Sequence, residues 1–236
     1  MFSIHTLDYP VAFIPPIEPV MRLIDFAPLI CNMPVSNQAF ISKRSTWSPY
    51  IQREDAAGTA LRSIFGTSND VFLSRHDLRL LASKAELAEF VIATIIWGYP
   101  GGMRGYHFAS LIDHLSKLAQ ILDAARSRPI SDWASHYEQV KPIEGVGLST
   151  YTKFLHFLSA QIENHMAVIL DKRIIDVTRN KVFEELAPLS ALSYENAPRH
   201  YPRYLECLES LAQRLSVPSE NIEFFLFEFG LHLKPT

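Results

Sequence analysis

Lys153 and Asp171 are the two residues of this sequence whose chemical types and spacing are best suited to act on one substrate. Lys153 lies in a predicted helix over 148–163, and Asp171 follows an apolar run, eighteen residues further along the chain. A buried lysine that loses its proton is a nucleophile, and a nearby carboxylate stabilises positive charge that develops during its attack. The structural alternatives are a lysine on a solvated helix face and an aspartate that caps a helix. Asp176, which follows an apolar pair, is an alternative carboxylate.

A short loop with two glycines precedes the lysine. Residues 143–147 read Ile-Glu-Gly-Val-Gly and connect a predicted helix over 131–141 to the helix over 148–163. Glycines allow the chain to turn sharply there, and the first amides of the second helix stay unpaired. Such amides, together with the positive end of the helix dipole, can hold a phosphate. We therefore predict a helix–hairpin–helix over 131–162 that grips a nucleic-acid backbone through Gly145, Val146, Gly147 and Ser149. A plain turn between antiparallel helices uses the same residue types.

Weaker candidates lie elsewhere along the chain. Arg104 follows a glycine-containing loop and could meet a phosphate. Aromatic rings beside that loop could line a base pocket or enter the gap that a displaced base leaves. A phenylalanine-rich C-terminal segment could supply a ring that stacks on the base. The residues singled out for pocket or wedge roles are Trp97, Tyr99, His156 and Phe225. For the aromatic residues the alternative is a place in the core.

Composition excludes several classes of protein. The chain has 236 residues, with 22 lysines and arginines against 25 aspartates and glutamates, so a strongly basic coat is absent. Nucleic acid would therefore have to be bound through a local patch and backbone donors. Two cysteines are too few for a disulfide scaffold, an iron–sulfur cluster or a cysteine-rich zinc site. The N-terminus does not resemble a signal peptide, and no apolar stretch reaches the length of a membrane span. We therefore expect a soluble intracellular protein.

The pattern of elements predicts an all-α protein in two lobes. Seven of the fifteen prolines lie in the first 50 residues, where we expect an irregular segment with extended parts and short helices. Helical patterns follow over 55–66, from Ser83 to Gly98, and over 106–126, 131–141, 148–163, 180–187, 201–215 and 219–230. We predict that residues 76–178 form one lobe. The irregular segment 1–75 would pack with 179–236 to form the other.

With these residues in place, the sequence resembles the helix–hairpin–helix DNA glycosylase superfamily, and within it the 8-oxoguanine DNA glycosylase branch. In that branch a glycine-containing hairpin is followed by a helix with a catalytic lysine, and a short apolar run then ends in a catalytic aspartate. The counterparts here are residues 143–147, Lys153 and Asp171. The resemblance is specific over about 143–176 and rests elsewhere on the all-helical pattern and the closing segment 219–230. Short bacterial members of the branch are associated with antiphage defence.

The resemblance implies an activity as well as a fold. A modified or oxidised purine such as 8-oxoguanine would be flipped out of double-stranded DNA into a pocket. Lys153 would attack the sugar C1′ atom and form a Schiff base, and β-elimination would then nick the strand, which is AP-lyase chemistry. The resemblance implies no organic cofactor. A monovalent cation is a candidate ligand of the hairpin. It also implies a cytoplasmic bacterial protein that is associated with the nucleoid when it is on DNA.

This sequence departs from the branch at the lysine. In the best-known members the lysine lies two residues after the second glycine, where Ser149 stands here. Lys153 is one turn, about 6 Å, further along the helix on nearly the same face, so a long side chain could reach back. The resemblance favours Asp171 over Asp176, because the spacing between Lys153 and Asp171 is close to that in the branch. The shift leaves two alternatives: a non-catalytic reader of modified DNA or of a nucleobase in antiphage defence, and an interaction domain without a base pocket.

Overall fold

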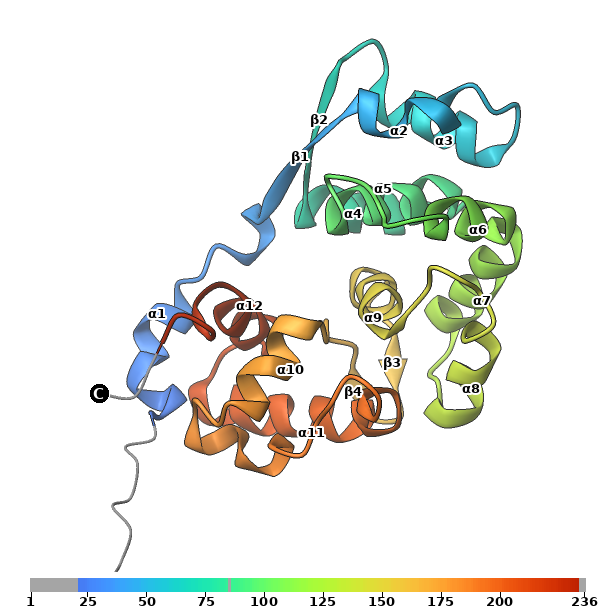
Figure 1. The fold of residues 1–236 in the computed structure, drawn as a ribbon. Coiled ribbons are helices and arrows are strands. Elements are labelled where there is room, and N and C mark those ends of the chain that lie inside the picture. Colours follow the sequence, from blue (N-terminus) through green and yellow to red (C-terminus); the bar gives the residue numbers. More distant parts are fainter. Residues whose placement is uncertain (1–20, 85, 234–236) are drawn as a thin grey trace, which may run out of the picture.

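The computed structural model describes residues 21–84 and 86–233, and helices dominate it, as predicted (Figure 1). Within these residues the strands form two short antiparallel ribbons. None of the described helices is both long enough and apolar enough to cross a membrane.

The helices form two main groups, a first one over 75–127 and a second one over 172–229. The N-terminal part of the described chain runs along both groups. Its first elements lie beside the C-terminal helices and are the 3-10 helix η1 (Leu23–Phe26), α1 (Ala27–Cys31) and η2 (Val35–Asn37). A ribbon then carries the chain to the upper helices in Figure 1. It pairs β1 (Ala39–Lys43) with β2 (Asp70–Ser74), and between the strands lie α2 (Arg44–Ile51) and α3 (Ala56–Phe65).

This arrangement differs from the predicted packing of the whole of 1–75 with 179–236. Residues 21–37 do contact the C-terminal helices, but the helix α3 packs against the first helical group. The reason is the apolar side of α3, where Ala57, Ala60 and Leu61 are buried. Residues 1–20 of the predicted segment lie outside the described part of the chain.

The first helical group surrounds an almost entirely buried helix. Its members are α4 (Arg75–Ala82), α5 (Ala88–Gly98), α6 (His107–Asp113) and α7 (Leu115–Ser127). Residues 90–97 of α5 are all buried, as their apolar run predicts. Two boundaries differ from the prediction: Ser83 ends α4 instead of capping α5, and the helix predicted over 106–126 is interrupted at His114.

The predicted helix–hairpin–helix is formed by α8 (Trp133–Val140) and α9 (Leu148–Phe157). Asp132, and not Ser131, caps α8 with its carboxylate. The second helix ends earlier than predicted, because the chain turns after Leu158 into the small ribbon of β3 (Gln161–Ile162) and β4 (His165–Met166). An extended run over 167–170 then leads to the next helix.

The second helical group contains the C-terminal elements. They are α10 (Lys172–Arg179), η3 (Glu184–Leu189), α11 (Ala197–Leu215) and α12 (Ser219–Phe229). Of the helix predicted over 180–187, only 184–187 are helical, in η3, because α10 ends at Arg179 and a non-helical stretch follows it. Figure 1 shows α9 between the two groups, so its residues are placed to meet side chains from both.

Candidate active site

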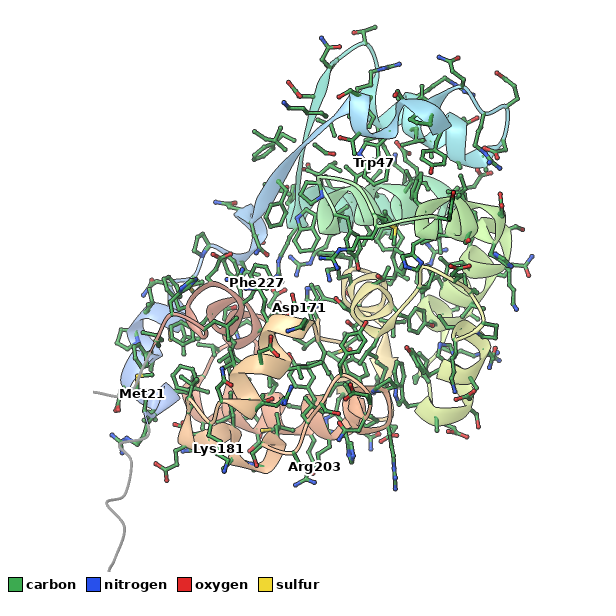
Figure 2. The ribbon with its side chains drawn as sticks, in the orientation of Figure 1. Met21, Trp47, Asp171, Lys181, Arg203 and Phe227 are labelled. Atoms are coloured by element: carbon green, nitrogen blue, oxygen red, sulfur yellow. The ribbon has the colours of Figure 1, made fainter. Side chains whose placement is uncertain are left out.

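Lys153 and Asp171 line the same pocket, which has a volume of about 210 Å³. The pocket lies where the two helical groups meet, and two of its lining residues, Asp171 at the start of α10 and Phe227 on α12, are labelled in Figure 2. Its walls are Gln38, Phe40, Arg75, Trp97, Gly98, Pro100, Lys153, Ile169, Asp171, Glu223 and Phe227. They come from β1, the α4–α5 region, α9, the extended run and α12, so only the tertiary structure brings them together.

The amine of Lys153 is folded back toward the start of its own helix. Only 8% of Lys153 is exposed, and Nζ donates to Ser149 Oγ at 2.8 Å and to the Ser149 carbonyl oxygen at 3.1 Å. Gly98 makes room for the stem: a Cβ at that position would lie 3.3 Å from Lys153 Cδ. The side chain thus places the amine about one helical turn back, beside Ser149. In the branch that the sequence resembles, the lysine itself stands at the position of Ser149.

Burial lowers the pKa of Lys153, and charged neighbours modify this effect. Asp171 and Glu223 favour the ammonium form and oppose the shift, whereas Arg75 adds to it. The net direction is downward, which favours the neutral amine that nucleophilic attack requires.

Asp171 caps α10 and faces the pocket as well. One of its carboxylate oxygens accepts a hydrogen bond from the amide of Ile174 at 3.1 Å, so the capping role that the sequence offered as an alternative is also present. Asp176 lies on the same helix, where it pairs with Lys172 and does not line the pocket. The structure therefore brings Asp171, and not Asp176, to Lys153.

Two buried tyrosines and a threonine hold the extended run that ends at Asp171. Tyr201 and Tyr204 of α11 donate their hydroxyl protons to the carbonyls of Val168 and Ile169 at 2.7 and 2.8 Å. The amide of Leu170 donates to Thr152 Oγ1 of α9 at 3.2 Å. These bonds satisfy backbone groups that would otherwise be buried without partners. The bond from Leu170 to Thr152 also holds the extended run against α9.

A buried ion pair forms another wall of the pocket. Arg75 and Glu223 each expose 1% of their side chains, and Arg75 Nη1 lies 2.8 Å from Glu223 Oε2. Arg75 Nε also donates to Gln38 Oε1 at 2.7 Å, and its guanidinium lies 5.6 Å from the ring centre of Trp97. Sequence reasoning missed this pair, since 148 residues separate its members and neither belongs to a motif.

The hairpin is built as the glycine pattern predicts. Gly145 has φ of +86°, and a Cβ there would lie 2.4 Å from the carbonyl oxygen of His107, so only glycine fits. Val146 is buried and anchors the turn. Among the described residues no hydrogen-bond acceptor is found for the amides of Gly147, Leu148 and Ser149, which begin α9. These amides are available to an anionic ligand.

The remaining predicted residues divide between the pocket, its surroundings and the core. Trp97 lines the pocket and is buried, with 4% of the residue exposed. The Tyr99 hydroxyl pairs with Thr150 Oγ1 at 2.8 Å, and its ring centre lies 6.0 Å from Lys153 Nζ. Arg104 is exposed in the loop between α5 and α6.

His156 and Phe225 lie away from this pocket. His156 lines a separate cavity of about 390 Å³ beside Arg79 and Glu220. Phe225 is fully buried against Phe26 and other rings. The ring of the same helix that reaches the pocket is Phe227, two residues further on, because alternate residues of a helix face nearly opposite sides.

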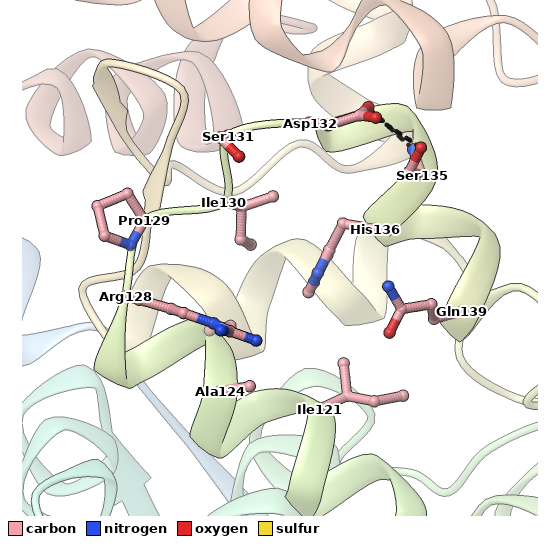
Figure 3. Close-up of a pocket in the computed structure, with 11 residues that line it drawn as sticks. Ile121, Ala124, Arg128, Pro129, Ile130, Ser131, Asp132, Ser135, His136 and Gln139 are labelled. Atoms are coloured by element: carbon pink, nitrogen blue, oxygen red, sulfur yellow. Dashed lines mark hydrogen bonds between the residues drawn. The ribbon is translucent and has the colours of Figure 1, made fainter.

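A third cavity, of about 360 Å³, lies between the end of α7 and the start of α8 (Figure 3). Figure 3 shows the carboxylate of Asp132 bonded to Ser135, whose amide and hydroxyl satisfy it. None of the predicted catalytic residues lines this cavity. Across the described residues no group of three histidine, cysteine, aspartate or glutamate side chains could hold a metal ion.

Comparison with known proteins assigns the chain to a family. Residues 33–227 match the model of a protein family described as "Putative 8-oxoguanine DNA glycosylase OGG-like protein". No curated protein and no solved structure matches the chain. The family match covers most of the chain, including the hairpin and every residue that lines the pocket. The chain belongs to the family of 8-oxoguanine DNA glycosylase OGG-like proteins.

Proposed function

We propose that this protein removes a modified or oxidised purine, such as 8-oxoguanine, from duplex DNA, with Lys153 as nucleophile and Asp171 as the carboxylate that stabilises the reacting sugar. The observation that carries the proposal is that Lys153 and Asp171, eighteen residues apart, line one small pocket. Burial, which lowers the pKa of Lys153, supports its role as a nucleophile.

The chemistry would proceed in two stages. The Nζ lone pair attacks C1′ while the bond from C1′ to the base breaks, and the base leaves with that electron pair and takes up a proton. The new amine then loses a proton, and its lone pair forms the C=N bond of the Schiff base while O4′ leaves C1′ with the electron pair of that bond and takes up a proton. Removal of a C2′ proton expels the 3′ phosphate and nicks the strand. The carboxylate of Asp171 would stabilise positive charge on the sugar during the first stage.

The pocket offers a flipped base both apolar and polar walls. Phe227, Phe40 and Trp97 supply aromatic surface, and the buried Arg75–Glu223 pair supplies charge. The guanidinium of Arg173, a residue that does not line the pocket, lies over the ring of Phe227, 4.6 Å from its centre. We assign Phe227 as the ring that stacks on the base, because stacking between a base and an aromatic side chain stabilises a flipped nucleotide.

The hairpin would bind the DNA backbone beside the pocket. Gly145, Val146, Gly147 and Ser149 would hold a phosphate through backbone amides, so the interaction does not need a basic surface. Arg104, in the exposed loop between α5 and α6, would add a charged contact. This mode of binding is compatible with the formal charge of −3.

Borohydride trapping tests the proposal. Wild-type protein is incubated with a duplex that contains one 8-oxoguanine and with a duplex that contains one abasic site, and borohydride reduces any Schiff base to a stable adduct. We expect a covalent adduct in wild type, none in Lys153→Ala, and an unchanged adduct in Lys172→Ala. Lys172 is a matched control because it is exposed, lies beside Asp171 in sequence and does not line the pocket.

Other outcomes would contradict the proposal in different ways. An adduct that persists in Lys153→Ala would remove Lys153 from the mechanism. Binding to both duplexes without any adduct would favour a non-catalytic reader of modified DNA. Absence of both binding and adduct would leave an interaction domain.

A further inference from the structure

The hydroxyl of Ser149 has a partner that a serine near the start of a helix does not ordinarily have. Serine near a helix start commonly bonds to the backbone or to the capping residue, as Ser135 does in α8, where it donates to Asp132. The cap of α9 is Gly147, which has no side chain to receive such a bond. In the described part of the chain, the partner recorded for Ser149 Oγ is Nζ of Lys153.

Ser149 offers the lysine amine two acceptors at once. Nζ of Lys153 lies 2.8 Å from Ser149 Oγ and 3.1 Å from the Ser149 carbonyl oxygen. A lysine ammonium has three N–H groups, and these two bonds use two of them. The third N–H group is then the one free to lose its proton, which would leave the lone pair on the side of the amine away from Ser149.

We propose that Ser149 is the positioning residue of the nucleophile: it holds two N–H groups of Lys153 so that the lone pair faces the pocket. This inference rests on the lysine chemistry proposed above and explains how a lysine one turn further along the helix can serve the same site. The backbone amide of Ser149 remains free for a phosphate, so its hydroxyl and its amide have separate tasks.

Gly98 completes the arrangement. The stem of Lys153 passes close to this glycine, where a Cβ would lie 3.3 Å from Cδ and 3.4 Å from Cε. A larger residue there would push the stem away and move the amine off Ser149. The ring centre of Tyr99, the residue after Gly98, lies 6.0 Å from Nζ. The lysine is thus confined by neighbours from α5 as well as from its own helix.

The charges that face the amine determine how its titration should respond. Asp171 at the start of α10 and Glu223 on α12 favour the ammonium, while Arg75 on α4 disfavours it, and burial lowers the pKa of Lys153 overall. The two hydrogen bonds that Nζ of Lys153 donates to Ser149 also favour the charged form, because an ammonium is a stronger donor than a neutral amine. Loss of the Ser149 hydroxyl should therefore lower the pKa of Lys153 further while it loosens the amine.

The test uses borohydride trapping under single-turnover conditions on a duplex with one abasic site, so that it does not depend on which base is removed. The trapping rate is measured from pH 5 to pH 10 for wild type, Ser149→Ala, Ser149→Thr and Ser135→Ala. For Ser149→Ala we expect the plateau rate to fall about tenfold to a hundredfold, the size of effect that small misplacement produces. We also expect the pH at half-maximal rate to move downward.

The comparison variants separate positioning from structure. Ser149→Thr keeps the hydroxyl and should retain the wild-type plateau and midpoint. Ser135→Ala loses a hydroxyl at the start of the other helix of the hairpin and should change neither. A wild-type profile in Ser149→Ala, with trapping still lost in Lys153→Ala, would overturn this inference alone. Absence of trapping in wild type would overturn both the inference and the function on which it rests.

Discussion

At the scale of single residues, Asp171 combines two tasks that a test must separate. Its carboxylate caps α10 through the amide of Ile174, and it also faces the pocket of Lys153. An aspartate-to-alanine change would remove both, and loss of the cap alone costs about 1 kcal/mol. Asparagine keeps a carbonyl oxygen that can cap the helix and removes only the charge.

We therefore predict that Asp171→Asn folds normally and reacts slowly. Trapping on abasic DNA should fall about a hundredfold to a thousandfold, the range found when one electrostatic contact to a transition state is lost. Because Asp171 favours the ammonium form of Lys153, its loss should also lower the pKa of Lys153, and the acid limb of the rate profile should move to lower pH. Single-turnover trapping and thermal unfolding measure the two effects.

Asp176→Asn is the matched control for this prediction. Asp176 belongs to the same helix but pairs with Lys172 outside the pocket. It should trap at the wild-type rate. If Asp176→Asn were the slow variant and Asp171→Asn the normal one, the assignment of the carboxylate would be wrong.

At the scale of elements, the hairpin depends on one glycine more than on any other. Gly145 combines φ of +86° with the close approach of the His107 carbonyl, so any side chain there is strained in two ways. The hairpin joins α8 to α9, and α9 carries both Ser149 and Lys153. A change at Gly145 therefore affects first the amides proposed to bind phosphate and then the proposed nucleophile, Lys153.

Gly145→Ala should weaken DNA binding about tenfold to a hundredfold, as expected when one or two hydrogen bonds to a charged group are lost. Its stability should also fall by about 2 kcal/mol or more, from backbone strain and overpacking. Fluorescence anisotropy with a labelled duplex and chemical unfolding measure these effects. Gly66→Ala is the control, because Gly66 has φ of +51° and nothing within 4 Å of its Cβ position. Loss of stability with wild-type DNA affinity in Gly145→Ala would contradict the proposed phosphate contact.

At the scale of the whole molecule, ion pairs connect the two helical groups. Arg75 and Arg79 on α4 pair with Glu223 and Glu220 on α12, and the members of each set are about one turn apart. His156 of α9 lies 3.4 Å from the Glu220 carboxylate. Of these contacts, the Arg75–Glu223 pair lines the pocket of Lys153, so charge as well as apolar packing forms its wall.

Glu220 should make stability depend on pH in the acid range. Burial alone would raise its pKa, but His156 and the charges of Arg79 and Arg75 outweigh burial and lower the pKa from 4.5 to about 2. A depressed carboxyl pKa stabilises the folded state above the unfolded value, and this contribution is lost as the pH falls from about 4.5 to about 2. The shift corresponds to about 3 kcal/mol.

Chemical unfolding of wild type and Glu220→Gln between pH 2 and pH 7 measures this contribution. The two free energies of unfolding should differ most near neutral pH and converge toward pH 2. Glu138→Gln is the control, because Glu138 forms an exposed pair with Lys141 and should change little at any pH. A constant difference between wild type and Glu220→Gln across this range would contradict the prediction.

The sequence by itself predicted the all-helical class, the hairpin, and Lys153 and Asp171 as a candidate pair. These features depend on local rules: apolar spacing that matches a helix, glycines at positive φ and a lysine and an aspartate on segments joined by one short connection. Boundaries were less secure. The break at His114 and the early end of α9 depend on packing that no local pattern records.

Only the tertiary structure decided what surrounds the lysine. The Arg75–Glu223 pair, Gln38 and Phe227 come from segments far apart in the sequence, and each is a common residue type without a motif. The choice between Phe225 and Phe227 depended on which side of α12 faces the pocket. The contact of Ser149 with Lys153 required the direction of a flexible side chain, which burial and Gly98 set. Local pattern fixes the elements, whereas burial and long-range charge fix which of their side chains meet.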